Sequence, residues 1–409
     1  MTIEGVVGIG LLIAGSFMGV PVAVVLGIVV LLFEVVRQIW SRRGLTNVHY
    51  ARHLGRDRLE WGDETPMTVS IWNRRRVPLA WLRADDNASP GVTVDERTLV
   101  VSGRGDLVLR NVWTLAPFER VVREFHIRAD RRGVFEIGPV ALSVGDLFAR
   151  EAGAEERDLV DTFLVRPRTV AAPNLLDEDR WGGDARARAG LSEDPSRFAG
   201  IRDYAPGDPI KRIHPRASAR LGRPVTKRFE PSRDREVLIA LDIQTTAGPI
   251  WDVDYDSEAV EALYVTVASI ARTLLGVGAA VGLTAAGYTG VESRFARLPV
   301  SASPGQAERL LDLLARLSSH PSAPFERLLT MVARTVRPGT TVVVLTTRDP
   351  VPFLAYLRGI GRQGASVLVV TCGPNGPADA ARARSAGLVA RCVQLDGPWR
   401  TAERLGVVA

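Results

Sequence analysis

The chain has 409 residues, of which 46% are hydrophobic and 24% are charged, and its formal net charge is +6. A hydrophobic fraction near one half excludes an intrinsically disordered chain, and the length is typical of two or three domains. Arginine exceeds lysine by 50 to 2. The codon bias of a GC-rich genome accounts for such an excess, so the basic charge by itself does not indicate a nucleic-acid partner.

The N-terminal segment contains an uncharged run of 29 residues, Gly5–Phe33, bounded by Glu4 and Glu34. A membrane-spanning helix needs about 20 apolar residues, so the run is long enough for one tilted span. A hairpin of two short spans, broken near Gly19–Pro21, is the alternative. We favour the single span, because two full helices would need more residues. A cleaved signal peptide fits less well, because no basic stretch precedes the run.

Three arginines, Arg37, Arg42 and Arg43, follow the apolar run closely. Positive residues that flank a span favour the cytoplasmic side of the membrane. The sequence therefore predicts a cell-membrane protein with residues 1–44 as its anchor. The rest of the chain is expected in the cytoplasm.

Short runs of alternating apolar and polar residues recur through residues 45–170, and Met67–Asn73 is one of them. The segment REFHIRADRRGVFEIGPVAL predicts two strands joined by a turn at Arg131–Gly133. Turn signals fall every ~8–12 residues, a spacing typical of antiparallel sandwiches. We therefore predict an antiparallel β-sandwich-like domain here, with no catalytic constellation.

Strand and helix patterns alternate through residues 236–409. The continuous apolar run Val237–Leu241 suits a parallel strand that is buried on both faces, and Ser257–Leu275 has helical periodicity. Further strands are expected within 279–287, 339–347 and 364–372, separated by amphipathic helical segments. This alternation predicts a doubly wound α/β sheet.

Oxygen-bearing side chains follow two strands of that expected sheet. Asp242 comes directly after the first strand, Thr246 lies four residues further on, and Asp349 follows the Val342–Leu345 strand. Ligands gather at the carboxyl ends of parallel strands, and oxygen ligands suit Mg²⁺. A structural role is the alternative, in which Asp242 caps its loop and Thr246 begins a turn. Spacing leaves both interpretations open.

The segment DYAPGDPIKRIHPRASAR, residues 203–220, combines a Pro-Gly turn with a run of cations, and both lysines fall in it or just after it. With its flanks it resembles the family called domain of unknown function 58. Members carry a signature of the form R-x-Y-x-P-G-D, followed by an arginine and by S-A-R. The matching positions, which we take as a partner-binding signature, are Arg202, Tyr204, Pro206, Gly207, Asp208, Arg212, Ser218 and Arg220.

The resemblance covers roughly residues 45–350. It implies an N-terminal membrane segment, a β-rich domain and a C-terminal domain similar to von Willebrand factor type A, with residues 171–235 as linker and signature segment. It also implies a partner, because family members are associated with MoxR-type AAA+ ATPases in assembling or maturing other proteins.

The chain departs from the family pattern at several positions. Pro215 stands where members usually have Trp. The type A metal motif, D-x-S-x-S with a later Thr and Asp, is degenerate: Asp242 and Thr246 fit it, but Gln244 replaces the first Ser. Asp349 lies a residue or two later than the motif implies. Mg²⁺ at this degenerate site is the one cofactor that the resemblance implies.

Between Arg202 and Arg228 the chain has eight cations and two acids. Asp208 could pair with Arg212 or Arg220 in a purely structural role, or the cations could form a docking surface for an acidic protein. We expect a non-enzymatic scaffold or adaptor, because GxSxG, HExxH and Cys/His patterns are missing. A cell-envelope hydrolase is one alternative, and a basic binder of anionic lipid or, less expected, nucleic acid is another. The sequence does not decide whether the protein forms a homo-oligomer.

Overall fold

The computed structural model describes the chain in segments that form two compact units, Met1–Val165 and Arg166–Ala409. It is a multi-domain structure, with sandwich-like β-sheets in the first unit and a mixed α/β sheet in the second. The described residues are 3–42, 45–95, 99–102, 105–145, 151–175, 193–204, 213–231, 236–246, 248, 256–290 and 294–408.

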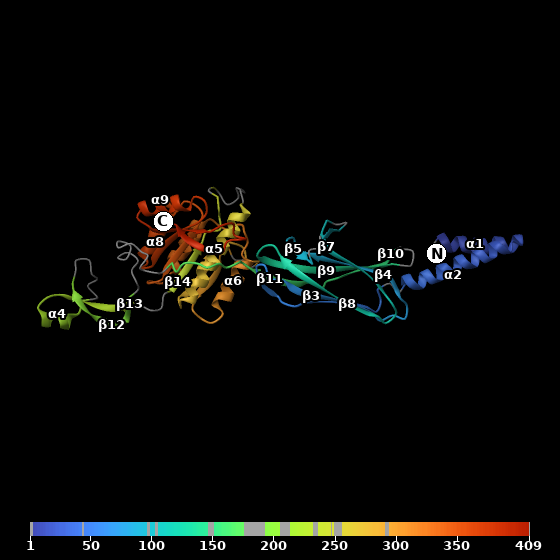
Figure 1. Cartoon of the computed structure of the whole chain (residues 1–409), viewed down its shortest axis with the longest axis horizontal. Helices are drawn as coiled ribbons and strands as arrows, with labels where there is room; N and C mark the ends of the chain where they lie inside the picture. The colour runs from blue at the N-terminus through green and yellow to red at the C-terminus, as the bar shows by residue number, and fades with distance from the viewer. Residues whose placement is uncertain are drawn as a thin grey trace. The chain divides into compact units, whose positions relative to one another are not determined.

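The N-terminal apolar run forms two helices, α1 (Ile3–Met18) and α2 (Pro21–Arg42), which pack side by side (Figure 1). Our preference for a single continuous helix is therefore wrong. The helix breaks because Gly19 adopts a left-handed conformation with φ of 65°, and because the ring of Pro21 cannot continue an α-helix. The chain reverses within two residues.

Glycines allow the two helices to approach closely. A Cβ on Gly15 would lie 2.8 Å from the Cβ of Ala23, and a Cβ on Gly27 would lie 2.8 Å from the backbone nitrogen of Leu12. Both distances are too short for any larger residue. The small residues of the run therefore determine how the hairpin packs, as they do between helices in membranes.

One helix among the described residues is both long and apolar enough to cross a membrane, and it is α5 (Ser257–Gly276). Most of it is buried inside the α/β unit, as expected of a core helix. The apolar stretches of the N-terminal hairpin, Gly5–Met18 and Pro21–Val35, are shorter.

The β-rich part contains two antiparallel sheets. The first has the order β1-β3-β8-β5, and the second has the order β2-β11-β9-β4-β7-β6, with β10 paired to β9. The strands are β1 (Val48–Leu54), β2 (Arg58–Glu60), β3 (Thr65–Asn73), β4 (Leu79–Ala88), β5 (Val92–Val94), β6 (Val100–Val101), β7 (Leu107–Leu115), β8 (Arg120–Ala129), β9 (Gly133–Gly145), β10 (Glu151–Arg157) and β11 (Asp161–Arg166).

Alternation along the strands builds the core of this part. In β3, residues 65, 67, 69, 71 and 73 are buried and the intervening ones are less so, because successive side chains point to opposite faces. Met67 and Ile71 are completely buried. The predicted turn at Arg131–Gly133 is confirmed, since β8 ends at Ala129 and β9 begins at Gly133.

A seven-stranded mixed sheet forms the centre of the second unit, in the order β16-β15-β14-β17-β18-β19-β20. Its strands are β14 (Glu236–Leu241), β15 (Ala280–Ala285), β16 (Ala296–Ser301), β17 (Thr341–Thr346), β18 (Ser366–Thr371), β19 (Val389–Leu395) and β20 (Leu405–Val408). The parallel centre is confirmed. The parallel strand β19 and the two antiparallel edge strands, β16 and β20, were not predicted from the sequence.

Helices cover both faces of the mixed sheet. They are α5, α6 (Gln306–Arg316), α7 (Phe325–Thr335), the 3-10 turn η3 (Val351–Phe353), α8 (Leu354–Arg362) and α9 (Gly376–Ser385). Val237, Ile239 and Leu241 of β14 pack with α5 and α6 residues, whereas Ala240 packs with those of α7 and α8. Because an apolar core lies on each face of the sheet, the sequence of β14 is a continuous apolar run.

The signature segment forms a separate element of the second unit, a hairpin of β12 (Glu193–Asp203) and β13 (Val225–Pro231). A seven-residue helix, α4 (Pro215–Leu221), lies between the two strands in the chain.

Candidate functional site

A buried carboxylate lies at the carboxyl end of the central strand β14. Asp242 directly follows the strand and is 1% exposed, and its backbone N–H donates to the carbonyl of Leu345 in β17 at 2.9 Å. The two strands are parallel neighbours, so their carboxyl ends meet at one edge of the sheet. The last residue of β17 and the residues that follow it are therefore brought to Asp242.

Two of those residues donate hydrogen bonds to the Asp242 carboxylate. Nε and Nη2 of Arg348 donate to Oδ2 and Oδ1 at 2.9 and 3.0 Å, and the Thr346 hydroxyl donates to Oδ2 at 2.8 Å. The guanidinium also lies 5.1 Å from the ring centre of Phe353. Burial raises the pKa of the Asp242 carboxyl, and the charge of Arg348 is the largest influence that lowers it. The positive charge of Arg348 thus compensates the buried negative charge of Asp242.

The other two residues of the predicted metal site have different partners. Oδ1 of Asp349 accepts a backbone N–H two residues further on at 3.0 Å, and its Oδ2 lies 3.0 Å from Nε of Arg382. Thr246 offers its backbone carbonyl to the side-chain amide of Gln244 at 2.9 Å. The Gln244 amide also donates to the carbonyl of Gly248 at 2.7 Å, so it ties the loop after β14 together.

This edge of the sheet does not fit Mg²⁺. Its buried carboxylate already accepts three hydrogen bonds and is paired with a cation, whereas Mg²⁺ needs free oxygens in octahedral geometry. Across the described part of the chain, no three His, Cys, Asp or Glu side chains are grouped so that they could hold a metal ion. Sequence reasoning missed Arg348 and Thr346, although Thr346 ends the strand next to β14 and Arg348 follows that strand.

The described part of the signature is held together by hydrogen bonds between α4 and β13. The Ser218 hydroxyl accepts from the backbone N–H of Val225 at 2.9 Å, and the Val225 carbonyl accepts from the backbone N–H of His214 at 2.8 Å. The N–H of Tyr204 donates to the carbonyl of Pro224 at 3.1 Å. The Ser218 hydroxyl and the Tyr204 backbone therefore help to hold the hairpin together.

Pro215 has a clear local role in place of the Trp that the family pattern has there. It is the first residue of α4, a position where proline suits the helix and where its missing N–H leaves no hydrogen bond unmade. The imidazole Nδ1 of His214 accepts from the backbone N–H of Ala217 at 3.2 Å and caps the helix. Gly222, with φ of 66°, ends the helix in the left-handed conformation.

Helix α4 has no buried residue and carries Arg216 and Arg220 one turn apart, both exposed. Among the described residues neither arginine has an ion-pair partner. Arg223 differs, since it pairs with Asp203 at 3.0 Å, and Arg202 is exposed and donates to the Asp203 carbonyl at 3.2 Å. We call Arg216 and Arg220 the basic face of α4. The predicted residues Pro206, Gly207, Asp208 and Arg212 lie outside the described residues.

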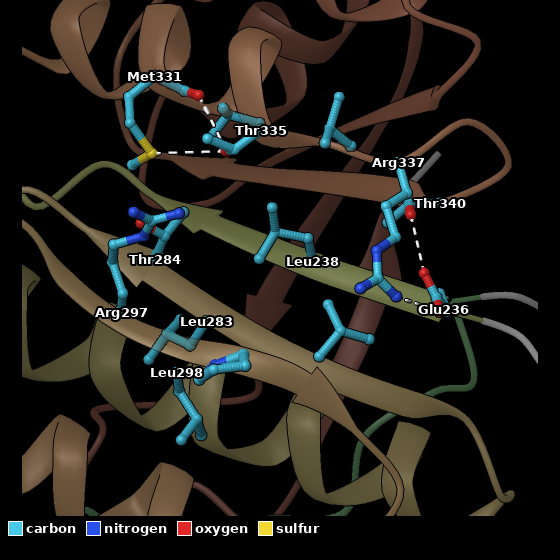
Figure 2. Close-up of a pocket in the computed structure, with 14 residues that line it drawn as sticks. Glu236, Leu238, Leu283, Thr284, Arg297, Leu298, Met331, Thr335, Arg337 and Thr340 are labelled. Carbon is cyan, nitrogen blue, oxygen red and sulfur yellow. Dashed lines mark hydrogen bonds and ion pairs between the residues drawn. The ribbon is translucent and has the colours of Figure 1, made fainter.

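A cavity of about 340 Å³ opens between α7 and strands β14 to β16. Figure 2 shows Leu238 on its floor, Thr284 and Arg297 at one end, and Arg337 with Glu236 at the other. The Glu236 carboxylate already accepts from the Thr340 hydroxyl at 3.1 Å and lies 3.8 Å from Arg337. No residue of the predicted signature or metal site lines this cavity.

Comparison with known proteins supports the family resemblance. Residues 200–368 match the family model described as "Protein of unknown function DUF58". The chain is also similar to "Uncharacterized protein YeaD" of Bacillus subtilis (strain 168), at 24% identity over 245 residues. That match covers 59% of this chain and 57% of the relative's length.

Two solved structures are similar to part of the chain. The CARDB domain of the PF1109 protein from Pyrococcus furiosus matches 29% of this chain and 86% of its own, at 13% identity and a TM-score of 0.20. A non-cellulosomal cohesin from Archaeoglobus fulgidus matches 29% of this chain and 91% of its own, at 10% identity and a TM-score of 0.21. Scores this low support no argument about function.

Proposed function

We propose that this chain is a non-enzymatic adaptor, anchored in the cell membrane by its N-terminal hairpin, that binds a protein partner through the basic face of α4. The observation that carries the proposal is the exposure of Arg216 and Arg220 on a helix with no buried residue. A helix that is held on a hairpin and buries none of its residues is well suited to present charge to another molecule. Exposed arginines favour an acidic partner.

The N-terminal hairpin supports the membrane anchor. Its large apolar side chains face outward, with Phe17, Met18 and Val22 exposed by 93%, 78% and 75%. Exposed apolar surface of this extent is unfavourable in water and favourable in lipid. The 16 residues of α1 are about 24 Å long, less than the ~30 Å hydrocarbon core, so a hairpin inserted from one side fits better than two complete spans.

Charge supports the cytoplasmic orientation. Arg37 lies in the C-terminal part of α2, Arg42 is its last residue, and Arg43 is next in the sequence. Arginines next to an inserted segment favour the cytoplasmic side, and a hairpin returns both of its ends to that side. The sandwich and the α/β unit would then both be cytoplasmic.

The partner follows from the family resemblance together with the chemistry of α4. We propose a MoxR-type AAA+ ATPase that offers an acidic surface. The parallel sheet with helices on both faces is consistent with a type A-like domain, whose carboxyl edge works here without metal because Arg348 compensates Asp242. In this proposal the α/β unit is a scaffold that carries the signature hairpin.

The test uses the full-length protein in nanodiscs and a purified MoxR-type ATPase from the same genome. We expect binding in the presence of ATP, and we expect the double variant Arg216→Glu/Arg220→Glu to weaken it at least tenfold. The wild-type affinity should also fall as salt is raised, because exposed ion pairs are screened. Binding is measured by biolayer interferometry over a salt series.

The matched control is Arg327→Glu/Arg334→Glu on α7, which reverses two exposed helical arginines elsewhere in the same unit. It should leave the affinity unchanged. Equal affinity for the α4 variant and the wild type would move docking away from α4. Failure of the wild type to bind the ATPase at all would overturn the proposed partner.

A further inference from the structure

Three loops meet at one end of the sandwich, the end where β1 begins and β3 finishes. The backbone N–H of Arg74 donates to the carbonyl of Asn47 at 3.0 Å, which ties the loop after β3 to the segment before β1. The N–H of Phe118 donates to the carbonyl of Arg75 at 3.3 Å, which adds the loop between β7 and β8. We call residues 45–48, 73–78 and 116–120 the loop end of the sandwich.

Asn73 fixes this loop end from inside. Its side chain is completely buried, and its Nδ2 donates to the carbonyls of Val77 and Ala116 at 3.0 and 2.9 Å. Its Oδ1 accepts from the backbone N–H of Arg75 at 3.2 Å. One amide therefore joins two loops that lie about 40 residues apart in the chain, and the surface that they present is ordered.

Phe118 is displayed at the tip of this surface. It is 61% exposed and has φ of 59°, a left-handed conformation that bulky residues rarely adopt. The turn is held by Glu119, whose carboxylate accepts from the N–H of Ala116 at 2.6 Å. Such strained conformations cluster at functional sites. Here the strained turn leaves an aromatic ring in contact with solvent.

Three exposed cations belong to the same loop end as the exposed ring. Arg74, Arg76 and Arg120 are all exposed, and within the described segments none of them has an ion-pair partner. The guanidinium of Arg74 lies 4.4 Å from the ring centre of Trp72, which is itself 38% exposed. Aromatic rings beside arginines are the combination found where proteins meet the headgroup layer of a bilayer.

The covalent chain keeps the loop end close to the N-terminal hairpin. Helix α2 ends at Arg42 and Asn47 follows five residues later, so even an extended chain separates them by only about 17 Å. This limit holds for any orientation of the sandwich. If the hairpin is inserted in a bilayer, the loop end must lie near the surface of that bilayer.

We propose that the loop end of the sandwich rests on anionic phospholipid, with Arg74, Arg76 and Arg120 at the phosphates and Phe118 inserted among the upper acyl chains. The inference rests on the proposed membrane anchor and adds a second contact to it. Arginines near an anionic leaflet are attracted to its phosphates, and this attraction orients a domain that is already tethered. The sandwich would then be held in one orientation relative to the membrane surface.

The test places the photoreactive residue p-benzoylphenylalanine at position 118 of the full-length protein. The protein is reconstituted in nanodiscs of phosphatidylcholine alone or with about one third phosphatidylglycerol, irradiated, and analysed for lipid adducts by mass spectrometry. Position 101 is the matched control. Val101 is 63% exposed, and its partner in the sheet, Leu107, is at the far end of β7 from the loop end.

We expect lipid adducts at 118 and not at 101, with a higher yield in the anionic discs. Arg74→Gln/Arg76→Gln should lower the yield at 118 in anionic discs more than in neutral ones. A protein that stays in the discs without forming adducts at 118 would overturn this inference and leave the anchor intact. A protein that does not enter discs at all would overturn both. Adducts to another protein in native membranes would reassign the surface to that partner.

Discussion

Arginine has opposite surroundings in two regions of the α/β unit. At the carboxyl edge of the sheet, the Arg348 side chain is 11% exposed and donates two hydrogen bonds to one buried carboxylate. On α4, Arg216 and Arg220 are exposed and have no ion-pair partner in the described residues. The comparison shows that the 50 arginines of the chain cannot be treated as one basic property, because tertiary contacts decide which charges remain available.

The largest expected effect comes from breaking the buried pair. Arg348→Met removes the cation and leaves the Asp242 carboxylate buried without compensation. We expect the free energy of unfolding to fall by about 3–5 kcal/mol, measured by urea denaturation followed by circular dichroism. Adding Asp242→Asn to that variant should recover part of the loss, because the uncompensated charge is removed. A single variant as stable as the wild type would show that water reaches Asp242.

The stability of the Arg348→Met variant should also depend on pH. Burial already raises the pKa of Asp242, and removing Arg348 takes away the largest influence that lowers it. An acid with a raised pKa in the folded state favours folding most below its unfolded pKa of about 3.9, and loses that contribution as the pH rises through the folded pKa. Both proteins lose this contribution together until the pH reaches the raised folded pKa of Asp242 in the wild type, so the stability gap between wild type and Arg348→Met should widen above that pKa and level off above the still higher folded pKa of the variant. A gap that is constant with pH would exclude Asp242 as its source.

A smaller effect is expected within the signature. Ser218→Ala removes the hydroxyl that accepts from the Val225 N–H at 2.9 Å. Val225 is 1% exposed, so water cannot readily replace this hydrogen bond, and we expect a local loss of about 1 kcal/mol. Amide hydrogen exchange at Val225 should accelerate about fivefold or more, with the α5 amides as the internal reference. Unchanged exchange would show that Ser218 does not hold α4 on β13.

The smallest effect on stability is expected at the basic face of α4. Arg220→Met is the counterpart of Arg348→Met, with the same change of side chain in an exposed setting. We expect the free energy of unfolding to change by less than about 0.5 kcal/mol, because exposed charges without partners contribute little. A loss as large as that of Arg348→Met would mean that Arg220 is buried against a part of the chain beyond the described residues.

Much of the fold could be predicted from local pattern. The alternation in Met67–Asn73 and the helical period of Ser257–Leu275 each led to the correct element, β3 and α5. The edge strands β16 and β20 were missed, because short strands with one neighbour carry a weak apolar pattern. The single N-terminal helix was also wrong. Its length allowed one span, but Gly19 and Pro21 decided the break.

The candidate site was predicted less well than the fold. Asp242 was correctly placed directly after the first parallel strand. The structure adds that this acid is buried there. Its partners were not identified, because Thr346 and Arg348 are about 100 residues away in sequence. They reach Asp242 only through the pairing of β14 with β17. Spacing in the sequence contains no information on that pairing.

The sequence by itself determined the apolar N-terminus, the β-rich and α/β regions and the cationic signature, because each is a property of neighbouring residues. Only the tertiary structure decided which charges are neutralised. Arg348 is buried against Asp242 because two parallel strands end at the same edge, whereas Arg216 and Arg220 stay exposed because α4 has no buried face. The strength of an electrostatic interaction depends on the distance between the charges, and Arg348 comes close to Asp242 only once the sheet has formed.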